Sequence, residues 1–369
     1  LKENGVLIMR LAFVTPLDTH KTGVSDYSFD LLPSLAKVVD GEIKVFHQDS
    51  EQHQRAFGDS WQYLPVAQLS RTTSEIDLSV YQMGNSSAHD FMAPFLFKYP
   101  GLVVLHALSL HNFYARQAME RGRHATYMRA FGFGYGLAGT LKARAYLQCP
   151  AEIGYPDYLL SEKLVTYSPG VIVHSRHATE ILRERCPMAR VWTVPMPIPL
   201  PDSTEGLEAR EQLGLAKDTY LIMVFGVINY SKRPIIILKT LARMLADHIP
   251  AHVVYIGQEN AEFQLNSEIR KLGLSEYVTH LGFVDDLSVV NHWLTAADVG
   301  ISLRSPYWGE TPSSALRLLA SGTPLIVNDI GAFSELPDSA CVKIDSDEVI
   351  VEKSLLDALK RLYEQERRR

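Results

Sequence analysis

One segment of the chain places an acidic side chain just before the start of a helix. Glu310 is followed by Thr311, which can cap a helix, and by Pro312, which suits a first helical turn. Gly322 suits the end of that helix, and Pro324 prevents its continuation. The spacing therefore predicts a short helix whose first turn lies beside a carboxylate.

The first turn of this helix has the chemistry of an anion site. Ser313 and Ser314 supply hydroxyl groups, and the unpaired amides of a first turn favour negative charge, as does the helix dipole. Glu310 can accept hydrogen bonds from hydroxyl groups nearby. A phosphate-binding site next to a carboxylate that binds hydroxyl groups suits a sugar nucleotide. The alternative is an ordinary capped helix, which has the same local sequence.

Cationic side chains follow two predicted strands of the same half of the chain. Lys232 and Arg233 come after the strand 220–225, and Arg304 comes after the strand 299–303. Lysine and the planar guanidinium of arginine both pair well with phosphate oxygens. A single such residue is usually a solvated surface charge, so the argument depends on all three lying at strand ends.

The first half of the chain offers weaker candidates. Gly23 lies in a loop where a backbone could approach a ligand closely, but it is not part of a G-x-G-x-x-G motif, which disfavours a dinucleotide oxidoreductase. His106 follows the strand 102–105, and His174 ends the strand 171–173 with Ser175 as a potential helix cap. Each also has an ordinary structural interpretation, as a turn glycine, a hydrogen-bonding histidine or a capped helix start.

The elements that would position these residues occur twice in the same order: strand, loop, helix and strand. In the first copy the strand, helix and strand are expected at 11–15, 26–38 and 43–46. In the second copy they are expected at 220–225, 234–247 and 253–256. Further strands are expected at 102–105, 171–173, 278–281, 299–303 and 325–327. This alternation predicts an α/β protein with two Rossmann-like doubly wound domains, 1–197 and 198–369, facing each other across a cleft.

Two expectations concern the ends of the first domain. Residues 191–201 are too rich in proline to continue a sheet or helix and are expected to form the hinge. Residues 6–14 form an apolar run that is expected to be the first strand. Met9 would be a natural start, so residues 1–8 are expected to be an extension with no role in the fold.

Length and composition agree with this organisation. A chain of 369 residues exceeds the usual limit of a single core. With 46% hydrophobic and 21% charged residues and a formal net charge of −6, the composition is that of a soluble globular protein and does not favour nucleic-acid binding. The three cysteines show no C-x-x-C spacing, which supports neither a disulfide framework nor a zinc site and favours a reducing cytoplasm.

The run from Ala296 to Val327 resembles the donor-binding segment of the family 4 retaining glycosyltransferases, which have the GT-B fold. The resemblance implies that Glu310 contacts the donor sugar. According to the same resemblance, the following segment, Thr311, Pro312, Ser313 and Ser314, holds the diphosphate through main-chain amides. It also implies that Lys232 neutralises this diphosphate, that Gly23 meets a donor phosphate and that His106 points its ring or carbonyl at the sugar.

The chain departs from the family pattern at two positions. Arg317 stands where a second glutamate usually binds the ribose, and Val227 replaces an arginine that usually follows the glycine. Arg304 and Arg233 are candidates to replace the lost cation. Phe283 and Val284 match the segment that holds the base.

No metal site is expected. The pair Asp285-Asp286 is not a D-x-D motif and is more typical of a helix cap. Lysine, arginine and a helix N-terminus could do the electrostatic work of a divalent ion.

A basic and aromatic stretch, 112–148, stands out in an acidic chain. Six basic residues face one acidic residue, Glu120, so the stretch carries a charge of 6 − 1 = +5. Two interpretations stay open: contact with anionic lipid headgroups or a lipid diphosphate acceptor, or a helical layer with aromatic core and solvated basic residues.

Together these features predict a metal-independent, retaining hexosyltransferase without a cofactor. It would move a sugar from a nucleoside diphosphate sugar, favouring a UDP-sugar such as UDP-glucose, to a hydroxyl of a glycan or lipid-linked saccharide in polysaccharide biosynthesis. Cytoplasmic localisation is expected, with peripheral contact at an anionic membrane. The alternatives are a non-catalytic nucleotide-sugar-binding protein of the same fold, motivated by Val227 and Arg317, and a GT-B UDP-sugar epimerase.

Overall fold

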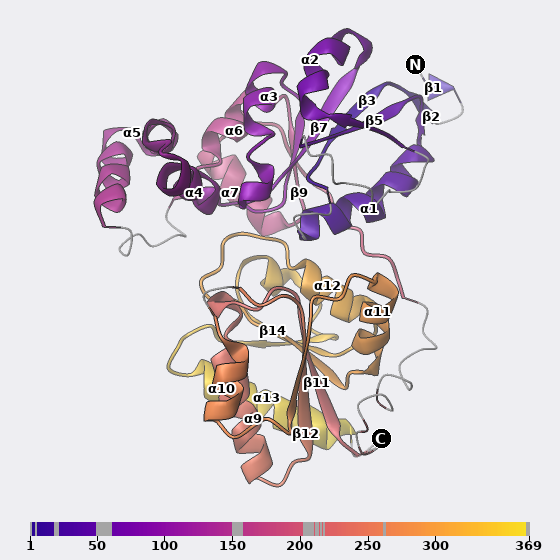
Figure 1. Ribbon diagram of the computed structural model, residues 1–369, viewed down its shortest axis with the longest axis vertical. Helices are drawn as coiled ribbons and strands as arrows, with labels where there is room; N and C mark the ends of the chain where they lie inside the picture. The colour runs from indigo at the N-terminus through magenta and orange to yellow at the C-terminus, as the bar shows by residue number, and fades with distance from the viewer. Residues whose placement is uncertain are drawn as a thin grey trace. The chain divides into compact units, whose positions relative to one another are not determined.

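The protein divides into two compact units, each with its own parallel sheet and flanking helices (Figure 1). The first unit comprises Leu1–Pro197 together with Trp308–Thr311, and the second comprises Ile198–Tyr307 and Pro312–Arg369. The computed structural model describes residues 2–3, 6–17, 22–48, 61–149, 158–201, 210, 214, 216, 218–260 and 263–366.

The first unit is built on a seven-stranded sheet of order β10-β9-β8-β7-β3-β5-β6, in which neighbouring strands are parallel. In chain order its strands are β3 (Leu11–Val14), β5 (Ile43–His47), β6 (Gln62–Pro65), β7 (Leu78–Met83), β8 (Leu102–Leu105), β9 (Val171–Val173) and β10 (Val191–Thr193). Because the strands are parallel, their carboxyl ends meet at one edge of the sheet, where ligands bind in open α/β folds.

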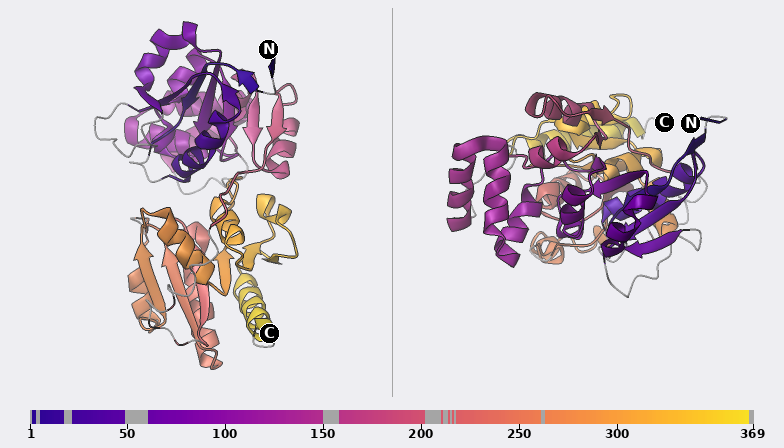
Figure 2. Two further views of the ribbon diagram at one scale, coloured as in Figure 1. Left: turned by 90° about the vertical axis from the view of Figure 1, so that its right-hand side faces the viewer. Right: turned by 90° about the horizontal axis from the view of Figure 1, so that it is seen from above.

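Helices cover both faces of this sheet (Figures 1 and 2). On one face, α1 (Gly23–Ala36) packs Leu32 against Leu11 and Phe13. The other face carries the larger core and a layer of α2 (Leu69–Thr72), α3 (Ala93–Lys98), α4 (His111–Arg121), α5 (His124–Gln148), α6 (Glu162–Tyr167) and α7 (Arg176–Arg185). Successive residues of a strand point to opposite faces, so Ala12 and Val14 join this second core.

The second unit has a six-stranded parallel sheet of order β13-β12-β11-β14-β15-β16. Its strands are β11 (Tyr220–Phe225), β12 (Ala251–Ile256), β13 (Val278–Gly282), β14 (Val299–Ser302), β15 (Leu325–Asn328) and β16 (Cys341–Ile344). The core on one face includes residues of α9 (Pro234–Ala246), α10 (Leu265–Lys271) and α13 (Val351–Glu366). The core on the other face includes residues of α11 (Leu287–Ala296) and α12 (Ser313–Ala320), so both units are doubly wound as the sequence predicted.

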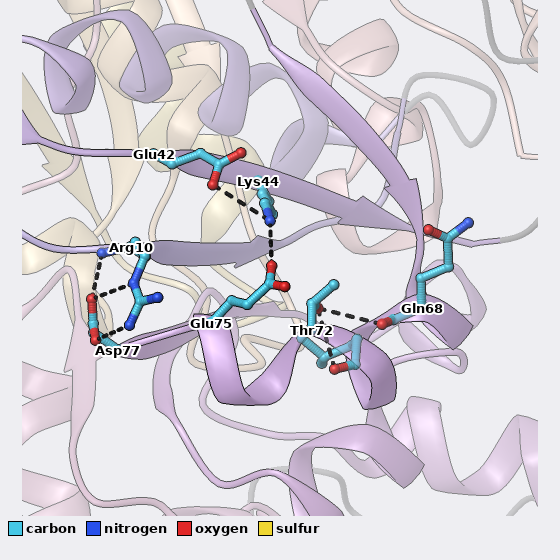
Figure 3. Close-up of polar contacts among 8 residues, drawn as sticks. Arg10, Glu42, Lys44, Gln68, Thr72, Glu75 and Asp77 are labelled. Atoms are coloured by element: carbon cyan, nitrogen blue, oxygen red, sulfur yellow. Dashed lines mark hydrogen bonds and ion pairs between the residues drawn. The ribbon is translucent and has the colours of Figure 1, made fainter.

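Polar contacts fasten the amino ends of the strands in the first unit (Figure 3). Arg10, just before β3, donates from its main chain and its guanidinium to Asp77, just before β7, at 2.8–3.2 Å. Lys44 near the start of β5 donates to Glu75 at 3.0 Å and lies 3.4 Å from Glu42. These contacts lie at the edge opposite to the carboxyl ends, so the sheet is tied together away from the edge where function is expected.

The structure corrects several expectations about element boundaries. Val191–Thr193 forms the edge strand β10, because the first proline of the predicted hinge comes only at Pro195 and these three residues can still pair with β9. Helix α1 begins at Gly23 rather than at residue 26, since Thr22 caps it by accepting a hydrogen bond from Ser25 N.

The expectation for residues 1–8 is wrong. The apolar run 6–14 is two strands, β2 (Val6–Ile8) and β3, and not one. Strand β2 pairs with β1 (Lys2–Glu3) and with β4 (Val39–Asp40), which makes a small three-stranded sheet. Residues 6–8 therefore take part in the fold.

Candidate functional site

Lys232 lies at the carboxyl end of β11. Its main-chain amide is held by the side chain of Asn229, which shapes a short turn after the strand. The Nζ atom donates a 2.6 Å hydrogen bond to the carbonyl oxygen of Phe225, and the residue is only 6% exposed. A cation is thus fixed at the edge of the sheet by the main chain of the strand itself.

Gly226 leaves the space that the ammonium group of Lys232 occupies. Its φ of +94° favours glycine, and a Cβ there would lie 2.5 Å from Lys232 Nζ and 3.6 Å from Ser314 Cβ. The ammonium group therefore lies directly over Gly226, on the side from which the first turn of α12 approaches. Lys232 and α12, which are far apart in the sequence, meet within the second unit.

Helix α12 begins at Ser313, with Pro312 as its N-cap residue. This is one residue later than predicted: Pro312 has a non-helical ψ of 73°, so Thr311 does not cap the helix. Among the described residues, no side chain caps this N-terminus, and the first amides of a helix have no acceptor within the helix. The helix terminus and Lys232 both favour an anion at this edge of the sheet.

The loop that follows β14 lies along the same edge. Ser305 N donates to the carbonyl oxygen of Ser231 at 2.8 Å, which joins this loop to the turn that carries Lys232. Arg304 N is held by Asn328 Oδ1 at 2.7 Å, at the carboxyl end of β15. Ser302 Oγ is buried and has no hydrogen-bond partner within the described part of the chain. The loop that contains Arg304 thus lies beside the turn that carries Lys232, and a role for Arg304 in binding phosphate stays a prediction.

The remaining predicted donor-binding residues of the second unit are placed differently. Arg233 makes an ion pair with Glu348 at 2.9 Å, so its guanidinium is engaged by a carboxylate of the protein itself. Phe283, which is 38% exposed, and the half-buried Val284 follow β13 at the carboxyl edge. Asp286 caps α11 by accepting from Ser288 N, as its sequence position indicated. Arg317 is buried on α12.

In the first unit, His106 belongs to a cluster of side chains at the carboxyl ends of β7, β8 and β9. Its Nε2 atom lies 2.9 Å from Gln82 Oε1, to which it donates. Its ring centroid lies 4.6 Å from that of Tyr27 on α1 and 5.2 Å from that of His174. His174 in turn donates from Nδ1 to the carbonyl oxygen of Val194 at 2.8 Å.

The surroundings of both histidines in this cluster favour the neutral form, because they lower the pKa of each ring. Burial lowers the pKa of His106 well below its ordinary value, and His174 and His89 nearby add to that effect. Burial also lowers the pKa of His174, although the hydrogen bond that His174 donates to the carbonyl oxygen of Val194 acts in the opposite direction. Gln82 Nε2 and His174 Nε2 are buried without a hydrogen-bond partner among the described residues. The cluster can therefore bind hydroxyl groups through neutral donors and acceptors.

Glu310 lies in the segment Trp308–Thr311, which belongs to the first unit. It forms an antiparallel bridge with Ala107, the residue after His106. Its Oε2 atom accepts a 2.9 Å hydrogen bond from Trp308 N. The structure therefore brings the segment of Glu310 alongside that of His106, although they are about 200 residues apart.

Gly309 makes this close pairing of chains feasible. Its carbonyl oxygen accepts from Leu108 N at 3.0 Å. Its φ is +76°, and a Cβ at this position would lie 2.3 Å from Leu108 Cβ. Only glycine satisfies both the backbone angle and the space.

The sequence analysis missed two residues of the His106 cluster, Gln82 and Tyr27. Gln82 lies near the end of β7, a strand that was not predicted; the alternating residues of 78–83 were the available signal. Tyr27 was predicted only as part of a helix. Gly23 is the exposed first residue of α1, and Ser175 caps α7 by accepting from Ala178 N, which confirms its structural interpretation.

The basic and aromatic stretch forms α4 and α5. Five of its seven aromatic residues are buried, which confirms the core interpretation for them: Phe113, Tyr114, Tyr127, Phe131 and Tyr146. All six of its basic side chains are exposed. Contact of this layer with lipid stays a prediction.

Within the described residues, no group of three or more histidine, cysteine, aspartate or glutamate side chains is arranged to hold a metal ion. The helices in that part of the chain include none that is long and apolar enough to cross a membrane.

Comparison with known proteins agrees with the fold. Residues 207–369 match the family model described as glycosyl transferases group 1. A curated relative, the lipopolysaccharide core biosynthesis mannosyltransferase LpsB of Rhizobium meliloti (strain 1021), is 26% identical over 135 residues, which are 35% of this chain and 37% of the relative. The match thus spans little more than a third of that protein's length.

Solved structures resemble the chain over nearly its whole length. Anabaena Alr3699/HepE, solved in complex with UDP and glucose, has a TM-score of 0.64 at 14% identity, over 97% of this chain and 91% of that one. A glycosyltransferase from Rickettsia africae ESF-5 has a TM-score of 0.65 at 9% identity, over 98% and 89% of the two chains. At this level of identity the likeness establishes the fold alone.

Proposed function

We propose that the chain, which has the GT-B fold and whose residues 207–369 match the family model of glycosyl transferases group 1, transfers a sugar from a nucleoside diphosphate sugar to an acceptor hydroxyl. The observation that carries the proposal is the position of Lys232, whose ammonium lies over Gly226 beside the first turn of α12. Two independent sources of positive potential at one edge of a parallel sheet suit a diphosphate.

The second unit is proposed as the donor side. Lys232, Arg304 and the first-turn amides at Ser313 and Ser314 stabilise the charge that develops on the departing nucleoside diphosphate. Fixed donors act without reorganisation at the moment of reaction, which makes such groups effective in catalysis. Phe283 and Val284 contact the base through their main chain.

The first unit is proposed as the acceptor side and also orients the transferred sugar. His106 is neutral, so it acts as a hydrogen-bonding group and not as a cation. Glu310 accepts hydrogen bonds from sugar hydroxyls. Orientation of this kind can supply a large part of a rate enhancement, because the reacting atoms are already aligned.

The proposed reaction is retaining and needs neither a metal ion nor a cofactor. The acceptor oxygen attacks the anomeric carbon on the face that the diphosphate leaves. The bond from that carbon to the phosphate oxygen breaks, and the phosphate oxygen takes the acceptor proton. This route requires leaving-group stabilisation and orientation, and no protein nucleophile.

The substrates are proposed from the relatives. The HepE structure contains UDP and glucose, and LpsB is named for lipopolysaccharide core biosynthesis. We therefore propose a UDP-sugar such as UDP-glucose as donor, and a glycan or lipid-linked saccharide in polysaccharide biosynthesis as acceptor. The cysteines Cys149, Cys186 and Cys341 are free, which suits a reducing cytoplasm. The exposed basic residues of α4 and α5 would place the protein at an anionic membrane surface.

The test has three readouts on the purified protein. Thermal shift with a panel of nucleotides should show stabilisation by UDP, because a ligand of the native state raises the melting temperature. UDP-glucose should be hydrolysed slowly without acceptor, and the anomeric coupling constant of a transferred sugar should match that of the donor. Chelation with EDTA should leave the rate unchanged.

Each contrary outcome has a distinct meaning. Nucleotide binding without any donor hydrolysis indicates a non-catalytic binding protein, and isomerised sugar without acceptor indicates an epimerase. Absence of both nucleotide binding and hydrolysis across the panel would refute the proposal.

A further inference from the structure

The helical layer of the first unit contains a pocket that the proposed reaction does not use. It has a volume of about 230 Å³ and is formed by residues of α3, α4, α5 and α6, together with Arg123 before α5. This is smaller than the roughly 300–1,000 Å³ of typical ligand pockets, so it suits one small chemical group.

Three cations line this pocket: Arg123, Arg129 and Lys163. Arg123 donates to Gln117 Oε1 at 3.3 Å and Arg129 donates to the carbonyl oxygen of Ala125 at 3.1 Å. In the described part of the chain, none of the three makes an ion pair with a carboxylate, although the charge of Arg123 acts on Asp90. This differs from the arginines on α4. There, Arg121 lies 2.8 Å from Asp90 and Arg116 lies 3.9 Å from Glu120.

The other walls of the pocket are apolar and aromatic. Phe97, Phe113 and Tyr114 line it beside Pro94 and Ala130. Lys163 Nζ lies over the ring of Phe97, 4.7 Å from its centroid, so charge and aromatic surface are contiguous.

An aromatic strip leads from the pocket to the surface. The ring of Phe97 lies 5.9 Å from that of Tyr167, and Tyr167 lies 6.2 Å from Phe133. Tyr167 is 55% exposed and Phe133 45%. Helix α5 then kinks at Gly136, and beyond the kink Leu137 and Leu141 are 77% and 58% exposed.

We propose that this pocket binds the phosphate of an anionic lipid, with the lipid chain lying along the aromatic strip. Three cations that make no ion pair with a carboxylate match a phosphomonoester better than a neutral or singly charged group, because guanidinium and ammonium groups bind phosphate oxygens strongly. Free phosphate would use the cations but would leave the exposed rings of Tyr167 and Phe133 in water. An amphiphilic lipid would contact both the cations and the exposed aromatic rings. The proposal does not depend on sugar transfer.

The test compares three soluble probes by titration calorimetry with the full chain: short-chain phosphatidic acid, glycerol phosphate and inorganic phosphate. Wild-type protein should bind short-chain phosphatidic acid at least about tenfold more tightly than either of the others. The double variant Arg129→Gln/Lys163→Gln should lose about tenfold of that affinity. The matched control Lys239→Gln/Lys353→Gln removes the same charge from exposed positions of α9 and α13 in the second unit, which do not line the pocket, and should bind within about twofold of wild type.

A second variant separates the lipid chain from the phosphate. Phe97→Ala should lower the affinity for phosphatidic acid while leaving the affinity for inorganic phosphate unchanged. Far-UV circular dichroism should show that each variant is folded. Equal affinity for all three probes would overturn the lipid assignment, and equal losses in the two double variants would show a diffuse charge effect. No binding of phosphatidic acid by wild type would overturn the site itself. Because no donor sugar is present, these outcomes are separate from those of the transfer assay.

Discussion

The ammonium group of Lys232 donates a 2.6 Å hydrogen bond to the main-chain carbonyl oxygen of Phe225, the last residue of β11. A long side chain that is ordinarily mobile is thereby fixed at the edge of a sheet. The contact is with the main chain, so its position does not depend on the conformation of another side chain.

Replacement of Lys232 should therefore weaken both nucleotide binding and catalysis. We expect Lys232→Met to lower the affinity for UDP by about tenfold to hundredfold, since a hydrogen bond to a charged group contributes roughly 1.5–3 kcal/mol. The control is Lys239→Met, which removes an exposed lysine from α9. Calorimetric titration with UDP checks both; an unchanged affinity in Lys232→Met removes this residue from the site.

Replacement of Glu310 should separate catalysis from nucleotide binding. In Glu310→Gln we expect turnover to fall by about hundredfold, in the range seen when one positioned polar group is lost, with UDP affinity within about twofold of wild type. The reason is that Glu310 is proposed to contact the sugar and not the diphosphate. Radiolabelled sugar transfer and UDP titration check this, and an equal loss in both measurements would contradict the assignment.

Gly309→Ala should destabilise the protein by more than a positive φ alone explains. The added Cβ would lie 2.3 Å from Leu108 Cβ, so we expect a loss of about 2–4 kcal/mol in the free energy of unfolding, from backbone strain together with overpacking. Gly122→Ala is the control: its φ of +65° is similar, but nothing lies within 4 Å of the added atom. Urea denaturation should show a clearly smaller loss in the control.

Acid should destabilise the protein through His111. Burial lowers the pKa of His111 to about 4 from an ordinary 6.5. The unfolded chain therefore binds a proton that the folded chain refuses between these two values, so stability is full above pH 6.5 and falls as the pH drops towards 4. The contribution is about 3 kcal/mol at most.

The variant His111→Gln isolates this effect. Glutamine can keep a hydrogen bond with the hydroxyl of Tyr127, which lies 2.9 Å from His111 Nε2, but it does not titrate. The gap in melting temperature between wild type and variant should therefore change between pH 6.5 and 4, in the direction of a relatively more stable variant at low pH. A gap that is constant with pH would argue against a depressed pKa.

The sequence predicted the regular parts of the fold because local patterns decide them. Strands β8, β9 and β11 begin and end at the expected residues, since each is a short apolar run with clear boundaries. Strand β7 was missed because Ser79 and Gln82 interrupt its apolar residues. The loss matters for the site, since Gln82 is the partner of His106.

Some residues of the candidate site could be named from the sequence, but their contacts in the fold could not. The presence of Lys232 and Glu310 is readable from motifs, whereas the contact of Lys232 with Phe225 and Gly226 depends on the path of a turn. Likewise, the ion pair of Arg233 with Glu348 joins residues 115 positions apart. Their roles in catalysis stay predictions until the variants above are measured.

The first unit is discontinuous along the polypeptide, because four of its residues, Trp308–Thr311, are encoded more than a hundred codons after Pro197. A fragment that stops at Pro197 would leave the amides of Leu108 and Ser109 without the acceptors that Gly309 and Trp308 provide. A single cut therefore cannot yield two self-sufficient halves. Any dissection of this protein must graft that tetrapeptide onto the amino-terminal piece.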